Sequence, residues 1–253
     1  INHRARARTA SLARAAGVSH YILASSCSVY GFHKDARTEQ SCTNPLTEYA
    51  HANLAAERDT IALAESGFSV TIMRLPTLFG ASPRMRLDLV VNSMCYSAWQ
   101  HGEIIVSGNG TQMRPLLNVS DVANAITRLI GRKLFNNTSR LLNIGSNSMN
   151  LSINDLAAGI CKYFRNRYDR TILLRHSDAH DQRSYRVDFS LLEQFLSWTP
   201  SLKINDSIDE IVDYIKNATD DDIARCHTLN WYQHLGGINF LMNHKSAKGS
   251  SLE

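Results

Sequence analysis

The hydrophobic and polar positions of the first 75 residues alternate between helix-like and strand-like patterns. Residues 5–16 are rich in Ala, Leu and Arg and stop at Gly17, which predicts a helix with a left-handed end. The short apolar run 20–24 predicts a buried strand, residues 47–66 predict a second helix that stops at Gly67, and residues 69–75 predict the next strand. The order helix, strand, helix, strand is typical of a parallel α/β sheet.

The pattern after residue 75 is less regular. Pro76 and Gly80 favour a loop, and residues 101–117, which carry three glycines, favour a hairpin or an irregular lobe. Residues 121–130 predict an amphipathic helix with Ser120 or Asp121 as its N-cap. The other predicted elements are helices at 87–100, 152–164 and 208–215 and a buried strand at 141–145.

Composition and charge narrow the function classes. The 253 residues are 43% hydrophobic and 20% charged, which predicts a globular chain with one or two domains. The net charge of +4 is spread along the chain, so we expect no nucleic-acid partner. The local cluster Arg4, Arg6, Arg8 and Arg14 is interpreted as a solvated helix face.

The cysteines and the apolar runs bear on location. Five cysteines form no C-x-x-C pair, so neither a disulfide framework nor a thiolate zinc site is predicted, and a cytoplasmic location is expected. No apolar run is long enough to cross a bilayer, and we expect no membrane partner. The chain starts at Ile1 inside a helical pattern, which favours a missing N-terminal segment.

Three segments carry candidate chemistry: residues 25–31 (SSCSVYG), 49–53 (YAHAN) and 74–80 (RLPTLFG). The series resembles the extended short-chain dehydrogenase/reductase family, whose motifs are S-S-x-x-V-Y-G, Y-x-x-x-K and R-x-x-N-x-Y-G-P. Further matches follow in the same order at residues 108–115, 118–123 and 143–145, and the resemblance runs from Asn2 to about Ile215. The motifs are those of its nucleotide-sugar epimerase/dehydratase members.

The resemblance implies an α/β fold with an incomplete Rossmann-type, doubly wound parallel sheet and a smaller α/β substrate-binding lobe. The distal part of the Rossmann-type domain is expected in residues 1–82 and 116–150. The nucleotide-sugar lobe is expected in residues 83–115 and 151–216. Residues 217–253 are expected to form a C-terminal extension, with a disordered polar end from about residue 246.

The resemblance also implies catalytic roles. A ketone or secondary alcohol exchanges hydride with a nicotinamide only if a proton moves at the same oxygen, and a phenol can move it. By motif position Tyr49 is that acid/base, Ser26 orients the reacting oxygen and Ser28 lies near the sugar. The implied cofactor is NAD or NADP, with Ala24, Tyr49, Asn53 and Pro76 on its side of the site. The structural alternative makes Tyr49 a core tyrosine and Ser26 a strand-end cap.

Two departures from the family pattern affect the cofactor. Asn53 stands where the family has the lysine that lowers the pKa of the phenol and holds the nicotinamide ribose, although Asn53 can still donate a hydrogen bond to a ribose hydroxyl. A cation about 4 Å from the phenol, at an effective dielectric of about 20, contributes roughly 4 kcal/mol. The sequence also has no G-x-x-G-x-x-G turn, so we expect the adenosine half of the cofactor site to be absent from this chain.

The substrate side follows the family more closely. Arg114 and Arg183 occupy positions that imply a clamp on the nucleotide diphosphate, which a guanidinium fork suits, with surface ion pairs as the alternative. Asn92 is a weaker candidate for the nucleotide or sugar, and Thr77 replaces an asparagine that many relatives have. His176 and His180 have helical spacing, but no metal site is predicted because no glutamate follows His176. The Cys226-His227 pair is interpreted as structural.

The predicted function is NAD-dependent epimerase, dehydratase or keto-reductase chemistry on a nucleotide-linked sugar, impaired in this chain alone. The alternative is a non-catalytic fragment of that family, which binds a nucleotide sugar or pairs with a complete subunit. A homodimer is expected through the helix that starts the chain and the helix that carries Tyr49, because Ala50, Ala52, Ala55 and Ala56 permit close approach.

Overall fold

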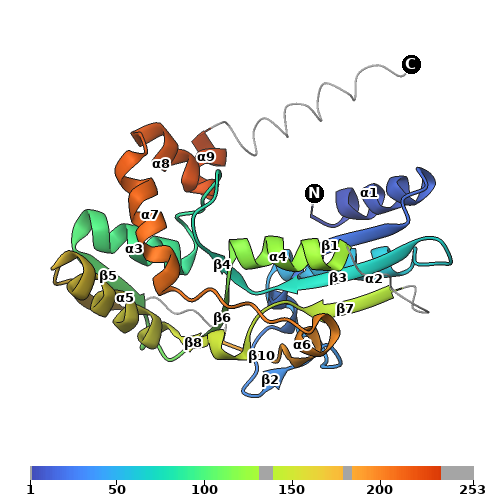
Figure 1. Cartoon of the computed structure of the whole chain (residues 1–253), viewed down its shortest axis with the longest axis horizontal. Helices are drawn as coiled ribbons and strands as arrows, with labels where there is room; N and C mark the ends of the chain where they lie inside the picture. Colours follow the sequence, from blue (N-terminus) through green and yellow to red (C-terminus); the bar gives the residue numbers. More distant parts are fainter. Residues whose placement is uncertain (1, 131–138, 179–183, 235–253) are drawn as a thin grey trace.

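A three-stranded parallel sheet organises the first half of the fold (Figure 1). The computed structural model describes residues 2–130, 139–178 and 184–234. Its parallel pairing, in the order β1-β3-β7, confirms the predicted α/β class. The elements of this half are α1 (Arg4–Ala15), β1 (His20–Ser26), the 3-10 helix η1 (Cys27–Tyr30), α2 (Glu48–Ile61), β3 (Ser69–Leu75), α4 (Val119–Ile130), β7 (Ser139–Asn143) and α6 (Ser190–Leu196).

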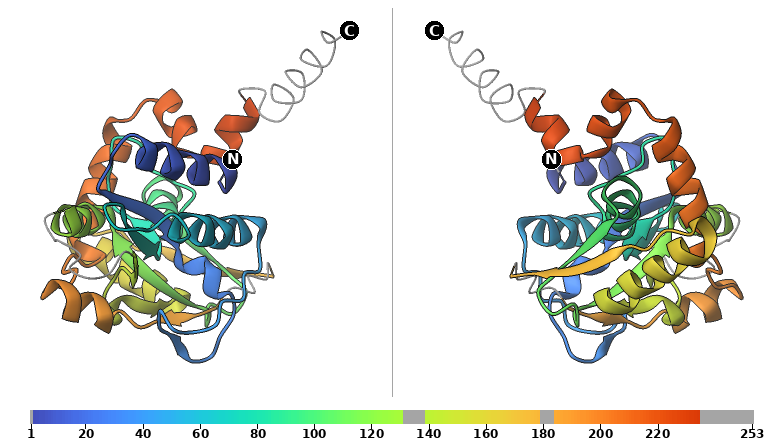
Figure 2. Two further views of the ribbon diagram at one scale, coloured as in Figure 1. Left: turned by 90° about the vertical axis from the view of Figure 1, so that its right-hand side faces the viewer. Right: turned by 90° about the vertical axis from the view of Figure 1, so that its left-hand side faces the viewer.

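Strand β3 shows why the sheet is covered on both faces. It lies between β1 and β7, and its five central residues are all buried. Val70 and Ile72 pack with α1 and α2 on one face, whereas Met73 packs with α4 and α6 on the other. Figure 2 shows these two helical layers on opposite sides of the sheet. A strand buried on both faces is rich in apolar and β-branched residues, and the predicted bounds 69–75 match the observed ones.

The second half forms a separate apolar core of helices and short strands. Helices α3, α5 and α7 pack against one another, and α3 and α5 also pack against β5. Three small sheets accompany them, with the orders β4-β6-β8, β5-β9 and β10-β2. Their elements are β2 (Ala36–Arg37), β4 (Thr77–Phe79), α3 (Val90–His101), β5 (Glu103–Ser107), β6 (Met113–Asn118), η2 (Asn147–Met149), β8 (Asn150–Ser152), α5 (Ile153–Tyr168), β9 (Leu173–Ser177), β10 (Arg186–Val187) and α7 (Asn205–Asn217).

Several sequence predictions need correction. Residues 101–117 form no hairpin, because β5 pairs in parallel with β9 and β6 pairs with β4 and β8. Helix α2 ends at Ile61, five residues before the predicted end, since 3-10 type bonds from the Leu63 and Ala64 amides tighten the chain. Helix α4 begins at Val119, and Asn118 accepts from the Ser120 amide at 2.7 Å.

The C-terminal part of the described chain supports the loop before α3. Helices α8 (Asp220–Cys226) and α9 (Thr228–His234) follow α7, and the Leu87 amide donates to the Cys226 carbonyl at 3.1 Å. The thiol of Cys226 lies 3.3 Å from the Tyr214 hydroxyl. The polar end predicted to be disordered from about residue 246 lies outside the described residues. Within the described chain, no helix combines the length and apolarity needed to cross a membrane.

Candidate active site at the carboxyl ends of the strands

A cavity of about 320 Å³ opens where β1 and β3 end. Parallel α/β sheets bind ligands at this edge, because loops and helix ends from neighbouring strands converge there. We call it the tyrosine cavity, after Tyr49 on the first turn of α2. Seven of the predicted site residues line it: Ala24, Ser26, Ser28, Tyr49, Pro76, Thr77 and Arg114.

A network of buried polar groups, which we call the floor, meets the tyrosine cavity at Ser25, one of the residues that line it. The Arg74 guanidinium contacts Glu57 through Nε and Nη2, at 3.0 and 2.7 Å, and donates from Nη1 to the Tyr30 hydroxyl at 3.0 Å. Ser25 donates to the same Glu57 carboxylate, and Tyr30 donates to Asn143 Oδ1 at 2.7 Å. These five residues join the ends of β1, β3 and β7 to α2. Their contacts hold those strand ends, and with them the cavity, in one geometry.

Burial sets the ionisation of the floor. It raises the pKa of the Tyr30 phenol to about 12, against the opposing charge and hydrogen bond of Arg74. For Arg74, burial would lower the pKa, but the hydrogen bonds and charge of Glu57 more than reverse this and the net shift is upward. Burial also raises the pKa of the Cys27 thiol well above its usual range. The floor is therefore a fixed Arg74–Glu57 ion pair beside a Tyr30 phenol that stays protonated at neutral pH.

Tyr49 differs from the floor because it is half exposed, at 48%. It lies on the wall of the tyrosine cavity and is not a core tyrosine, so the structural alternative does not describe it. The Thr47 hydroxyl caps α2 by accepting from the Ala50 amide at 3.2 Å, which fixes the first turn of the helix. A phenol at this position can meet a ligand in the cavity.

The two serines after β1 have different settings. Ser26 accepts from the Ser28 amide at 3.2 Å and so caps η1, as the structural alternative predicted, while its own O–H remains a donor. The Ser28 hydroxyl oxygen is buried and, among the described residues, has no hydrogen-bond partner. Gly31 then ends η1 with φ +68°, and a side chain there would collide with the Asn44 carbonyl. Ser28 lines the tyrosine cavity, and its hydroxyl is a buried polar group without a partner among the described residues.

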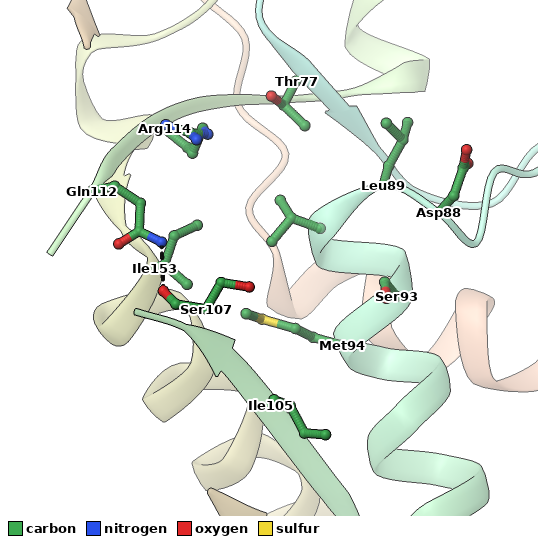
Figure 3. Close-up of a pocket in the computed structure, with 11 residues that line it drawn as sticks. Thr77, Asp88, Leu89, Ser93, Met94, Ile105, Ser107, Gln112, Arg114 and Ile153 are labelled. Carbon is green, nitrogen blue, oxygen red and sulfur yellow. Dashed lines mark hydrogen bonds between the residues drawn. The ribbon is translucent and has the colours of Figure 1, made fainter. Parts of the chain in front are cut away.

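A second cavity of about 320 Å³ adjoins the first (Figure 3). Thr77, Leu89 and Arg114 line both cavities. The second one lies between the start of α3 and strands β5 and β6, and Gln112 at its side donates to the Ser107 carbonyl at 3.0 Å. We call it the lobe cavity. Arg114 stands at the junction, where one ligand would bridge the two halves of the fold.

Three predicted site residues do not line either cavity. Asn53 is fully buried, accepting from Arg6 Nη1 at 2.6 Å and donating to the Tyr49 carbonyl at 2.8 Å. Asn92 is also buried, and its amide group contacts the backbone of Gly80 and Arg86. Arg183 lies outside the described residues. The ligand contacts proposed for these three residues stay predictions.

Sequence reasoning missed two arginines of the tyrosine cavity. Arg6 was placed on a solvated helix face, but its side chain turns inward, and it lies one helical turn before the fully buried Ala10. That spacing was the available signal. Arg86 also lines the cavity and forms a two-point ion pair with Asp88, at 2.9 and 2.8 Å. Hydrogen bonding to Asp88, opposed by burial, raises the pKa of Arg86.

The histidine pair considered as a metal site is only partly described. His176 Nδ1 lies 2.9 Å from the Gly108 carbonyl, whereas His180 is outside the described residues. Over residues 2–130, 139–178 and 184–234, no group of three or more His, Cys, Asp or Glu side chains is placed to hold a metal ion.

The parallel sheet with helices on both faces and the adjoining lobe define a Rossmann-type α/β protein. Residues 1–145 match the family described as the NAD dependent epimerase/dehydratase family. The chain therefore belongs to that family, which confirms the resemblance seen in the motifs.

Individual relatives agree with this assignment. An uncharacterized UDP-glucose epimerase, YtcB, from Bacillus subtilis (strain 168) is 25% identical over 205 residues, or 79% of this chain and 61% of that protein. The chain thus spans about three-fifths of the length of this relative. The structure of MoeE5 in complex with UDP-glucuronic acid and NAD is 26% identical, with a TM-score of 0.74 over 86% of this chain and 72% of MoeE5.

A more distant solved structure supports the fold alone. It is the UDP-glucuronic acid 4-epimerase from Bacillus cereus, which is 21% identical, with a TM-score of 0.72 over 85% of this chain and 67% of that one.

Proposed function

We propose that this chain binds a nucleotide-linked sugar across the tyrosine and lobe cavities and carries the residues for epimerase- or dehydratase-type chemistry on that sugar. The observation that supports this most is the convergence of Tyr49, Ser26, Ser28 and Arg114 on one cavity at the carboxyl edge of the sheet. The sugar lies against Tyr49 and the serines. The diphosphate lies at Arg114, and the base lies in the lobe cavity.

The side chains have distinct tasks in this proposal. The Tyr49 phenol takes or returns a proton at the reacting sugar oxygen, and Ser26 donates a hydrogen bond to that oxygen. The free hydroxyl of Ser28 binds a second sugar oxygen. Arg114 meets the diphosphate by charge-assisted hydrogen bonds. Thr77 lines both cavities beside it and contacts the ligand at the junction.

The residues fit the nicotinamide end of an NAD molecule and not its adenosine end. Ala24, Tyr49 and Pro76 line the tyrosine cavity and would hold the nicotinamide, whose chemistry is to accept or return a hydride. The glycine-rich turn that binds the pyrophosphate in such folds does not occur in this sequence. We therefore propose that NAD binds weakly to this chain alone and that turnover is impaired.

The second candidate function, sugar-nucleotide binding without turnover, is favoured by Asn53. Its amide is buried against Arg6 and the Tyr49 carbonyl, so it does not supply the cation that the family motif has at this position. One assay separates the two functions: UDP-glucose and NAD are incubated with the chain, and products are followed by NMR. Turnover that Tyr49→Phe abolishes supports the enzyme, whereas UDP-glucose binding without any product supports the binding protein.

Nucleotide binding itself is tested by calorimetry with UDP, the nucleotide of the MoeE5 complex. Arg114→Ala should weaken UDP binding about ten- to a hundredfold, because a charge-assisted contact of roughly 1.5–3 kcal/mol is lost. Arg175→Ala is the matched control, since this exposed arginine pairs with Glu103 in the same lobe and lines neither cavity. Equal UDP affinities for wild type and Arg114→Ala would contradict the proposed diphosphate site.

We also propose the homodimer through α1 and α2. The two helices lie side by side, joined by His3–Asp59 and Arg6–Asn53 contacts of 2.6 Å, as the sequence predicted. Ala50 and Ala56 are buried within the chain, so Leu12, 60% exposed on α1, is the better candidate for the interface. Light scattering should show a dimer that Leu12→Glu dissociates and that Leu173→Glu, on exposed β9, does not.

A further inference from the structure

The guanidinium group of Arg6 lies where the sheet edge and α2 meet. Arg6 comes from α1, lines the tyrosine cavity together with Tyr49, and donates from Nη1 to Asn53 Oδ1 at 2.6 Å. Asn53 is on α2, one helical turn after Tyr49 and on the same side of the helix. Asn53 thus holds the arginine beside the tyrosine.

The charge of Arg6 is not neutralised by this contact, because Asn53 is an uncharged acceptor. Within the described residues, no carboxylate lies within ion-pair distance of Arg6. The charge of Arg6 acts on a neighbouring group: burial raises the pKa of Tyr21, and the positive charge of Arg6 opposes that rise. A guanidinium has five N–H donors, and the bond to Asn53 uses one of them. Arg6 therefore brings a positive charge and further donors to the cavity wall.

We propose that Arg6 takes over the cofactor contact of the motif lysine that Asn53 replaces, by donating hydrogen bonds to the ribose hydroxyls of a nicotinamide nucleotide. Asn53 is a positioning residue that acts through Arg6. The proposal rests on the proposed function, because it assigns the Tyr49 end of the cavity to the nicotinamide. It gives the ribose contact to Arg6 in place of Asn53, whose side chain is fully buried.

The other cations of the cavity are less suited to this contact. Arg86 forms a two-point ion pair with Asp88, which occupies one edge of its guanidinium. Arg114 donates to the Met113 carbonyl at 2.9 Å and stands at the junction with the lobe cavity. Arg6 is the cation attached directly to the position that the lysine has in the family motif.

The test measures binding of nicotinamide mononucleotide by ligand-observed NMR, so it needs neither turnover nor an adenosine site. Arg6→Gln should weaken binding about tenfold, as expected for the loss of one charge-assisted hydrogen bond. Arg6→Lys should recover most of the affinity. Arg8→Gln is the matched control, because it removes the same charge from the exposed face of the same helix and should leave binding unchanged. If Arg6→Gln does not fold, Arg6→Leu keeps the aliphatic bulk and replaces it in the test.

A double-mutant cycle tests the positioning role of Asn53. If Asn53 acts through Arg6, then Asn53→Ala and Arg6→Gln together should weaken binding no more than Arg6→Gln alone. Additive losses in the two single variants would overturn the positioning role of Asn53. Equal affinities of wild type and Arg6→Gln for nicotinamide mononucleotide would overturn the proposed Arg6 contact. Undetectable binding by wild type would overturn it as well. UDP affinity is measured on the same samples and reports on the Arg114 side. Absence of UDP binding by wild type would contradict the proposed function. The nicotinamide mononucleotide measurement would still decide whether Arg6 makes the ribose contact.

Discussion

The floor network and the rim of the tyrosine cavity, where Arg86 lies, each contain an arginine held at two points by a carboxylate, but the environments of the two ion pairs differ. On the floor, the side chains of Arg74 and Glu57 are 6% and 3% exposed and share the buried hydrogen bonds of Ser25 and Tyr30. On the rim, the Arg86 and Asp88 side chains are 48% and 28% exposed. The two ion pairs have the same chemical groups, but loss of one partner should affect the stability of the fold differently in the two places.

The difference shows which part of the site can change without loss of the fold. A buried ion pair stabilises little compared with apolar side chains, but removing one partner leaves an uncompensated charge in a medium that solvates it poorly. In an exposed pair, water and dissolved salt screen much of the attraction between the two charges. The floor therefore fixes the ends of the strands, whereas the rim can be altered to suit a ligand.

Breaking the floor should have the largest effect. Glu57→Gln leaves the Arg74 guanidinium buried without its counter-charge, and we expect unfolding free energy to fall by roughly 3–5 kcal/mol, measured by urea denaturation. Glu65→Gln is the control, because its contact with Arg14, at 3.6 Å, is exposed. Similar stabilities for the two variants would show that the floor is no more critical than a surface pair.

Asn53 shares features of both places, because its side chain is fully buried, as on the floor, but it accepts a hydrogen bond from Arg6, which lines the cavity. Restoring the family lysine with Asn53→Lys should therefore destabilise the chain by roughly 1–3 kcal/mol, since a second cation would be buried beside Arg6. The double variant Asn53→Lys with Arg6→Gln should recover part of that loss, as measured by urea denaturation. A double variant less stable than Asn53→Lys would contradict the proposed repulsion between the two cations.

The sequence predicted those parts of the fold that depend on local pattern. Strand β3 matched because a short segment rich in β-branched and apolar residues lies between the breakers Gly67 and Pro76. Residues of the tyrosine cavity were found through motifs that follow the strand ends, and Ser26, Tyr49 and Arg114 do lie together. Whether these residues bind the ligands assigned to them remains a prediction.

The features that were missed depend on contacts between distant segments. Strand β5 pairs with β9, 70 positions away in the register Glu103 to Leu173, and no local pattern contains that partner. Asp121, a predicted N-cap, is buried instead and accepts from the amides of Ser201 and Leu202. The inward turn of Arg6 likewise depends on α2, whose Asn53 receives it.

The smallest effect is expected at the rim. Asp88→Asn removes an ion pair that solvent screens, so the loss should be within roughly 0.2–1 kcal/mol at neutral pH. The hydrogen bond from Arg86 lowers the pKa of Asp88 below its usual value of 3.8, so the pair stabilises the fold above that pH and the contribution is lost as the pH falls through the folded-state value. Wild type should therefore lose slightly more stability than Asp88→Asn on acidification below about pH 4, in urea melts at low salt. Asp178→Asn, which alters an exposed aspartate beyond β9, is the control. A rim variant as damaging as Glu57→Gln would remove the distinction between floor and rim.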